Sequence, residues 1–248
     1  PRLGARYTKR KIMNPPKQYR AKLEDKEQLN ERFVQYHFEL VEPNELTFAA
    51  GQYASIKVSE KGERRSYSIC SSPAVSHGFE LLVDHKPAGI GCTYLENMVF
   101  GQEIEFLAPL GIFTILPDEA ETSLALIATG SGIAPFRSML FEQLQVKHDT
   151  RPITLHWGMR HANTLFWEDE FEELAQSFPN FSFHPVISQP EQAWPLCRGR
   201  VTDCLSTHEL AVGTGYYLCG NAHMIEDVTQ TLLAKDVAAE HIHHEKFY

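Results

Sequence analysis

The hydrophobic pattern of the first half of the chain predicts a series of short strands. β-prone runs of strand length alternate with turn-forming stretches such as Glu42-Pro43-Asn44-Glu45 and Lys61-Gly62. The expected strands are Tyr19–Leu29, Phe33–Val41, Tyr53–Val58, Ser66–Ser71, Phe79–Asp84 and Glu103–Leu107, with one helical piece at Thr93–Met98. Several short strands at this spacing favour a small antiparallel β-barrel.

The second half has a different pattern, in which short apolar runs alternate with amphipathic ones. Strands are expected at Leu124–Ala128, Ile153–Trp157, Phe181–Ile187, Tyr216–Cys219 and His241–Phe247. Helices are expected from Pro135 to about Gln145, at Leu165–Phe178, at Val201–Ser206 and from the N-cap Asn221 through Leu233. This alternation predicts an open parallel sheet with helices on both faces.

A linker is predicted where the two patterns meet. The stretch Leu116–Ser123 holds a proline and three acidic residues. The chain has 248 residues, which is enough for two domains with cores of their own. We therefore expect a barrel domain over residues 1–118, of which 1–20 form a basic arm, and an α/β domain over residues 119–248.

The charge of the chain is unevenly distributed. Residues 1–22 hold eight Lys or Arg and no acid, which leaves 15 bases against 32 acids in the remainder. The net charge is −9 for the whole chain and −17 for this remainder, which argues against a broad nucleic-acid surface. The basic segment is either a docking element or a solvated tail, and the tail is the simpler interpretation.

The sequence gives little support for a membrane protein, a secreted protein or a metal-binding protein. No apolar run approaches the roughly 18 residues that span a bilayer, and no secretory pattern opens the chain, so we expect a cytoplasmic protein without a membrane span. The five cysteines form no CxxC, so we expect reduced thiols and neither a zinc site nor an iron–sulfur cluster. His241 and His243 share a strand face, but two histidines are a weak site, and no metal is expected.

A glycine-rich loop follows the first strand of the second half. In Thr129-Gly130-Ser131-Gly132-Ile133-Ala134-Pro135 the glycines and a helix start could cradle a pyrophosphate. Pro135 stands where the dinucleotide pattern G-x-G-x-x-G requires its last glycine, so a tight turn is the alternative. The spacing around Ser131 does not match the G-x-S-x-G of a nucleophile elbow, which excludes that class of serine hydrolase.

Three further motifs carry candidate chemistry. Arg65-Ser66-Tyr67-Ser68 combines a cation, an aromatic ring and hydroxyls on one strand, which would suit a flavin or be an ordinary polar strand. Gly89-Ile90-Gly91-Cys92-Thr93 opens a helical stretch and is a second candidate anion cradle. Cys219-Gly220-Asn221 lies at a strand end, where ligands bind in open α/β sheets, although a buried cysteine is usually a core residue.

In this order, the motifs resemble those of the ferredoxin–NADP(+) reductase superfamily from about Ala21 to Tyr248. Arg65–Ser68 matches the family's R-x-Y-S flavin motif, Gly51-Gln52-Tyr53 its G-Q-Y turn and Gly89–Thr93 its second flavin loop. Thr129–Phe136 matches the nicotinamide-nucleotide loop, and Cys219-Gly220-Asn221 with Met224 matches the later C-G-x-x-x-M element. The resemblance implies an FAD-binding barrel followed by an NAD(P)-binding domain.

The same resemblance implies residue roles. Ser68, Cys219 and Glu245 would be catalytic, with Ser68 near flavin N5, Cys219 beside the nicotinamide and Glu245 closing a polar network there. The residues implied in FAD binding are Arg65, Ser66, Tyr67, Ser68, Gly91, Cys92 and Thr93. Those implied in nicotinamide-nucleotide binding are Thr129, Gly130, Ser131, Gly132, Arg160, Cys219, Gly220, Asn221 and Met224. Either Phe247 or Tyr248 would cover the flavin.

The loop after Trp157 bears on the choice of coenzyme. It contains Arg160 and no acid before Glu168. Arginine accommodates the 2′-phosphate of NADP, whereas NAD enzymes often place an acid on the ribose, so the loop favours NADPH. Family members that use NADH can carry arginine there too, and Arg160 could be only an exposed loop charge, so NADH stays open.

The resemblance implies an FAD-dependent NAD(P)H oxidoreductase. Such an enzyme would move hydride between nicotinamide and FAD and exchange single electrons with a separate ferredoxin, flavodoxin or oxygenase iron–sulfur component. Two alternatives stay open: a reductase of free flavin or small acceptors, and a redox-inactive regulatory subunit. Because ferredoxins are commonly acidic, we further predict that the basic residues 1–22 help to dock the partner.

Overall fold

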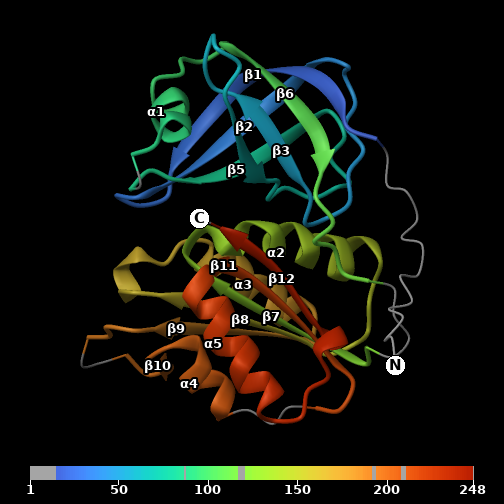
Figure 1. The fold of residues 1–248 in the computed structure, drawn as a ribbon, viewed down its shortest axis with the longest axis vertical. Coiled ribbons are helices and arrows are strands. Elements are labelled where there is room, and N and C mark those ends of the chain that lie inside the picture. The colour runs from blue at the N-terminus through green and yellow to red at the C-terminus, as the bar shows by residue number, and fades with distance from the viewer. Residues whose placement is uncertain (1–14, 87, 117–120, 192–193, 208–210, 248) are drawn as a thin grey trace, which may run out of the picture.

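The computed structural model describes residues 15–86, 88–116, 121–191, 194–207 and 211–247, which form two domains stacked end to end (Figure 1). The predicted boundary near residue 118, the first part of the basic arm and Tyr248 lie outside these residues. Within the described ranges, no helix is long and apolar enough to cross a membrane.

The first domain is the expected antiparallel barrel. Its strands are β1 (Lys17–Gln28), β2 (Phe33–Glu42), β3 (Tyr53–Lys57), β4 (Arg64–Ser68), β5 (Gly78–Asp84) and β6 (Glu103–Leu110). They pair in the order β4-β3-β6-β1-β2-β5, and an antiparallel bridge between Ile69 and Leu81 nearly closes the barrel. The single helix of this domain in the described residues, α1 (Ile90–Glu96), begins at Ile90 rather than at Thr93.

The second domain is the expected open parallel sheet. Its strands are β7 (Ser123–Thr129), β8 (Ile153–Met159), β9 (Phe181–Ile187), β10 (Cys197–Arg198), β11 (Thr214–Asn221) and β12 (Ile242–Phe247), in the spatial order β10-β9-β8-β7-β11-β12. Its helices are α2 (Ile133–Leu140), α3 (Glu168–Ser177), α4 (Val201–Ser206) and α5 (Ala222–Leu233). Short 3₁₀ turns lie at Gly130–Gly132, Ala162–Thr164 and Ala239–His241, and a π-helical segment at Phe141–Val146 extends α2.

Strand β7 shows why the sheet carries helices on both faces. Leu124, Leu126 and Ala128 belong to the apolar cluster that includes α2 and α3, whereas Ala125 and Ile127 belong to the cluster that includes α4 and α5. Successive side chains of a strand point to opposite faces, so a continuous apolar run buries both faces of the sheet.

Local backbone conformation explains most of the differences from the predicted bounds. Helix α3 begins at Glu168 rather than at Leu165, because Leu165 is extended and Trp167 has a positive φ of 55°. The expected N-cap of α5 is confirmed, since the side chain of Asn221 accepts a hydrogen bond from the His223 N–H at 2.8 Å. Strand β10 was not predicted, because two residues carry no periodic pattern.

The expectation of reduced thiols is wrong for one pair. Cys197 and Cys204 form a disulfide with a Cα–Cα distance of 5.7 Å, whereas Cys70, Cys92 and Cys219 are free. The two bonded residues lie on β10 and α4, and the turn between these elements brings them together, which the sequence spacing alone did not indicate.

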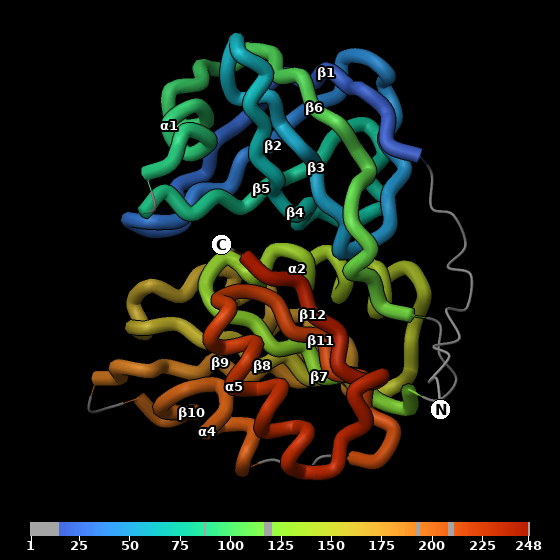
Figure 2. Tube along the Cα trace, in the orientation of Figure 1, coloured from blue at the N-terminus to red at the C-terminus, as the bar shows by residue number. Residues whose placement is uncertain are grey.

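The two domains pack closely against each other. Phe33, Cys70 and Leu82 of the barrel belong to the same apolar cluster as the residues of α2. Gly51 has a φ of +94°, and a Cβ there would lie 2.0 Å from the Phe113 carbonyl oxygen and 2.4 Å from the end of the Met139 side chain on α2. The chain trace shows β12 running up to this junction (Figure 2).

Candidate active site

The three residues implied as catalytic lie together where the domains meet. Ser68 is buried at the end of β4, and its Oγ donates a hydrogen bond to Glu245 Oε2 on β12 at 3.4 Å, although the two are 177 residues apart in sequence. Cys219 on β11 is the direct register partner of Glu245. A strand end of the barrel and two strands of the sheet therefore converge on one polar point.

Burial controls the protonation of this group. Burial raises the pKa of Glu245 to about 7, and the hydrogen bond from Ser68 opposes the shift. Burial also raises the pKa of the Cys219 thiol well above its usual range, and the neighbouring Glu245 adds to that shift. The cysteine is therefore a neutral thiol at physiological pH, whereas Glu245 can hold or release a proton there.

The flavin motifs of the barrel meet in the structure. A Cβ on Gly91 would lie 2.3 Å from the Tyr67 hydroxyl and 2.8 Å from the Arg65 Cγ, so the first turn of α1 packs directly on β4. Arg65 and Ser66 are exposed and Tyr67 is half-buried. A glycine at position 91 is thus required by the protein's own packing.

The residues present suit an FAD pyrophosphate. The Arg65 guanidinium donates one hydrogen bond, to the Arg64 carbonyl oxygen, within the described part of the chain, which leaves further donors available. Helix α1 begins after Gly89 without a side-chain cap, and a Cβ on Gly89 would meet nothing within 4 Å. A cation and uncapped backbone N–H groups beside open space are the donor set that a diphosphate needs.

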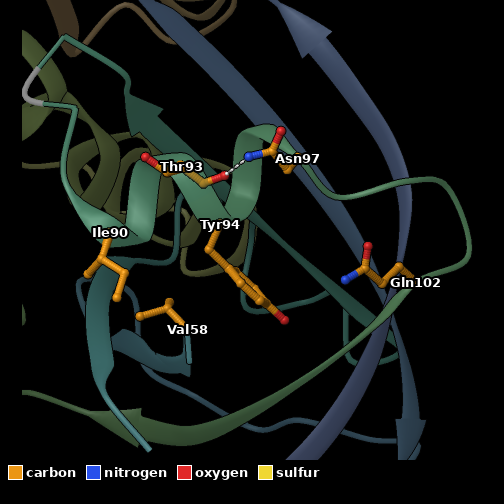
Figure 3. A pocket seen from close by; sticks show the side chains of 6 residues that line it. All are labelled: Val58, Ile90, Thr93, Tyr94, Asn97 and Gln102. Atoms are coloured by element: carbon orange, nitrogen blue, oxygen red, sulfur yellow. Dashed lines mark hydrogen bonds between the residues drawn. The ribbon is translucent and has the colours of Figure 1, made fainter. Parts of the chain in front are cut away.

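Cys92 and Thr93 are positioned differently from each other. Cys92 is half-buried, and its thiol donates a hydrogen bond to the Asp84 carbonyl oxygen at 3.2 Å, which holds α1 against β5. Thr93 is exposed and lines a cavity of about 420 Å³ together with Val58, Ile90, Tyr94, Asn97 and Gln102 (Figure 3). This cavity therefore lies along another face of α1 than the one that Gly91 packs on β4.

The nucleotide loop is held tightly against β11. A Cβ on Gly132 would lie 2.2 Å from the Cys219 carbonyl oxygen, and one on Gly220, whose φ is +132°, would lie 2.5 Å from Thr129 Oγ1. Thr129 Oγ1 accepts a hydrogen bond from the Asn221 N–H at 3.1 Å. These two glycines are thus required by contact between loop and strand, whatever ligand the loop holds.

Two other predicted loop residues remain accessible. Gly130 has a φ of +55°, and its carbonyl oxygen accepts a hydrogen bond from Trp157 Nε1 at 3.0 Å. Ser131 is half-buried. Beside them, the carboxyl ends of β7 and β11 form the edge where ligands bind in open parallel sheets.

The remaining predicted residues are dispersed. Met224 is buried on α5, in the cluster that α4 and α5 form with the sheet. Arg160 is exposed at the end of β8. Phe247 is half-buried at the end of β12 and packs against the cluster that joins the two domains. Tyr248 is not among the described residues, so the structure does not choose between the two rings.

Sequence reasoning gave no individual role to two buried polar residues that shape the junction, although Gln52 lies in the matched G-Q-Y turn. The Gln52 amide accepts from the Ala49 N–H at 2.9 Å and donates to the Gly111 carbonyl oxygen at 3.1 Å, beside Glu245. Arg137 is buried on α2 with carboxylates from both domains. Its position within the apolar run Ile133–Leu140 was the available signal, because a charge there requires buried partners.

Family models match both halves of the chain. An oxidoreductase FAD-binding domain matches residues 20–115, and an oxidoreductase NAD-binding domain matches residues 126–230. Within the described residues, no group of three or more His, Cys, Asp or Glu side chains could hold a metal ion.

Curated relatives include components of oxygenase systems. The toluate 1,2-dioxygenase electron transfer component of Pseudomonas putida is 30% identical over 231 residues, which are 92% of this chain and 67% of that protein. The anthranilate 1,2-dioxygenase electron transfer component of Acinetobacter baylyi is 32% identical over 205 residues, 82% of this chain and 59% of that protein. The chain thus spans about three fifths to two thirds of the length of these relatives.

Solved structures share the two-domain arrangement. The Amycolatopsis cytochrome P450 reductase superposes with a TM-score of 0.87 at 27% identity, over 96% of this chain and 72% of that one. A ferredoxin–NADP+ reductase from Neisseria gonorrhoeae with bound FAD and NADP superposes with a TM-score of 0.80 at 24% identity, over 93% of this chain and 99% of that one. The second match is a likeness of fold.

Proposed function

The chain belongs to the ferredoxin–NADP(+) reductase superfamily, and we propose that it is an FAD-dependent NAD(P)H reductase that passes electrons to a separate iron–sulfur protein. The observation that carries the proposal is the convergence of Ser68, Cys219 and Glu245 at the domain junction. FAD supplies the chemistry when bound, because it accepts a hydride and can release its electrons singly.

The chain's own residues would bind and orient the two cofactors. Arg65 and the start of α1 would hold the FAD diphosphate. The half-buried Tyr67 would offer its ring to the isoalloxazine. The edge formed by Gly130 and Ser131 would receive the nicotinamide nucleotide from the other domain. The protein contributes to hydride transfer mainly by holding the two reactants close together in the correct orientation.

The polar group at the junction would manage hydrogen bonding and a proton. Ser68 offers a hydroxyl that can donate or accept, and Glu245 can be protonated or ionised near neutral pH because its pKa lies at about 7. Cys219 adds a neutral, polarisable surface beside them. Together they would provide a partly buried site in which a proton can be held next to the reacting rings.

The preferred coenzyme would be NADPH. Arg160 follows β8 at the carboxyl edge of the sheet, where its backbone carbonyl accepts a hydrogen bond from the Gln189 N–H at 2.8 Å and its side chain is exposed. The exposed Arg160 guanidinium would favour the 2′-phosphate of NADPH.

The partner would be an iron–sulfur protein, either a ferredoxin or the iron–sulfur component of an oxygenase. A flavodoxin, which carries a flavin instead of a cluster, is a further candidate. Electron transfer components of dioxygenases among the relatives support this class. A cytoplasmic location is part of this proposal.

One experiment tests the whole proposal. Purified protein is passed through gel filtration to see whether FAD stays bound, and it is then reduced anaerobically with NADPH or NADH. Ferredoxins and oxygenase iron–sulfur proteins are added to the reduced enzyme. Retained FAD that either coenzyme bleaches, followed by reduction of a partner, supports the proposal. Loss of FAD on the column would favour a free-flavin reductase, and failure of both coenzymes to bleach bound FAD would favour a redox-inactive subunit.

A further inference from the structure

Arg137 is a buried charge that the site described so far does not use. It lies on α2, the helix that follows the nucleotide loop directly, and only 8% of its surface is exposed. A buried guanidinium is tolerated only where hydrogen bonds and opposite charges replace its water. The groups that contact Arg137 in place of water therefore indicate which parts of the protein this residue holds together.

Part of the guanidinium is bound within its own domain. Its Nε and Nη2 donate to the two carboxylate oxygens of Glu170 on α3 at 2.7 and 2.8 Å, which is a bidentate pair. Its central carbon lies 4.6 Å from the ring centre of Trp167 and 4.8 Å from that of Phe141. These contacts fix the plane of the guanidinium relative to α2 and α3.

The remaining nitrogen reaches across to the barrel. Arg137 Nη1 donates to Glu80 Oε2 on β5 at 2.6 Å and to the Cys70 carbonyl oxygen at 3.2 Å. Cys70 comes two residues after Ser68, and its N–H donates to the Glu80 carbonyl oxygen at 3.0 Å. This one nitrogen thus binds both the segment after β4 and strand β5. The two lie side by side at the seam where the barrel closes, directly after the flavin motif in the chain.

The barrel side of this contact is itself held firmly. Glu80 Oε1 pairs with His37 Nδ1 on β2 at 3.2 Å, so both carboxylate oxygens are engaged. Trp167 Nε1 donates to the buried Gln35 Oε1, also on β2, at 2.9 Å. The domains are therefore joined here by directional hydrogen bonds as well as by apolar packing.

Both charges are maintained. Although burial opposes the charged form, Glu170 and Glu80 raise the pKa of Arg137 above its ordinary value. Burial likewise opposes ionisation of Glu80, but His37 and Arg137 outweigh it and lower the pKa of that carboxyl. The contact is thus a charged, directional one, which distinguishes it from the surrounding apolar interface.

We propose that Arg137 is a positioning residue for hydride transfer. It fixes the flavin strand of the barrel, β4, in position relative to the nucleotide loop of the α/β domain. The inference rests on the proposed function. On one side the residue belongs to α2, the helix that directly follows Gly130–Gly132, and on the other it binds the Cys70 carbonyl oxygen just after Ser68. A displacement of about 1 Å between reacting groups can cost about a hundredfold in rate, so a rigid tie at this point controls transfer without touching the cofactors.

Two substitutions are expected to break this tie between Arg137 and the barrel, and one matched control substitution leaves it intact. Arg137→Lys keeps the charge but loses the planar fork, and Glu80→Gln removes the acceptor charge on the barrel side. Arg151→Lys is the control, because Arg151 is also partly buried and bidentate, to Asp149, yet its contacts in the described structure stay within the α/β domain. Coenzyme affinity and the rate of flavin reduction are measured separately by anaerobic stopped flow.

We expect Arg137→Lys and Glu80→Gln to slow flavin reduction at saturating coenzyme by about tenfold or more, while coenzyme affinity changes less than about threefold. Arg151→Lys should leave the rate within about twofold of the parent. An unchanged rate in both tie-breaking variants would overturn the proposal, and so would an equal loss in the control, which would indicate a general effect on stability.

A second measurement does not depend on flavin chemistry. Hydrogen–deuterium exchange of the FAD-free protein should be about tenfold faster at residues 69–71 and 78–81 in Arg137→Lys and Glu80→Gln, and unchanged there in Arg151→Lys. Unchanged exchange at this seam in both tie-breaking variants would refute the tie even if they fail to bind FAD. If the parent protein shows the protected seam but transfers no hydride, the proposed function fails and the tie between the domains stands.

Discussion

Ser68 Oγ and Glu245 Oε2 lie 3.4 Å apart across the junction of the two domains, so the flavin strand of the barrel and the last strand of the sheet share a hydrogen bond. This bond brings a carboxyl group whose pKa is about 7 into the place where the two cofactors are expected to meet. We therefore expect the chemistry at the junction rather than within either domain.

The rate of flavin reduction should depend on pH through Glu245. We expect the parent enzyme, at saturating coenzyme, to show an inflection near pH 7, the value to which burial raises the pKa of this carboxyl. Glu245→Gln should remove the inflection, since an amide does not titrate. Glu240→Gln, at an exposed site on the turn before β12, is the control and should keep it. A profile that is unchanged in Glu245→Gln would assign the inflection to another group.

The same carboxyl should affect the stability of the FAD-free protein. Its pKa is raised from 4.5 to about 7 on folding, so the folded state binds the proton more tightly and stability from this group falls as pH rises between these values. We expect Glu245→Gln to gain up to about 3 kcal/mol in unfolding free energy, relative to the parent, between pH 4 and pH 8. Urea unfolding at both pH values measures it, and a difference that does not change with pH would contradict the prediction.

Gly91 and Gly89 offer a matched pair at the start of α1. A Cβ on Gly91 would lie 2.3 Å from the Tyr67 hydroxyl, whereas one on Gly89 would meet nothing within 4 Å. In the FAD-free protein, Gly91→Ala should therefore cost about 1–3 kcal/mol of unfolding free energy and Gly89→Ala much less. Gly91→Ala should also weaken FAD binding, because it displaces Tyr67 and Arg65. Equal stabilities of the two variants would show that α1 shifts to make room.

Arg160 should determine coenzyme preference. Arg160→Ala is expected to lower kcat/KM for NADPH by about tenfold or more and to change that for NADH by less than about twofold, because only NADPH carries the 2′-phosphate. Steady-state dye reduction with each coenzyme measures both values, and NADH serves as the internal control. A similar loss with both coenzymes would place Arg160 in general binding or folding.

The basic arm should matter only for the protein partner. Arg20 pairs with Glu42 and Glu103, and Lys22 pairs with Glu39, so these two bases are already neutralised within the barrel. Any docking charge must then come mainly from the more terminal bases. Removing residues 1–14 should slow partner reduction at low ionic strength and leave dye reduction intact, and added salt should erase the difference. Identical partner kinetics would leave the arm as a solvated tail.

The local pattern of the sequence was sufficient for the architecture. The short β-prone runs of the first half predicted an antiparallel barrel, and the alternation of apolar with amphipathic runs in the second half predicted an open parallel sheet; the structure confirms both architectures. The N-cap at Asn221 was also predictable, because capping depends on neighbouring residues. Boundaries such as that of α3 were missed where one residue, Trp167, takes a left-handed conformation that its side chain does not favour.

The sequence by itself therefore determined the fold class, the order of the motifs and the residue types available for flavin and nucleotide. Only the tertiary structure decided that Ser68 meets Glu245, that Gly132 is required by the Cys219 carbonyl, and that Arg137 ties the barrel seam to α2. The physical reason is the range of each effect, because secondary-structure propensity and hydrophobic periodicity depend on residues only a few positions apart in the chain. Contacts between distant segments depend on how two finished domains pack, which short patterns do not encode.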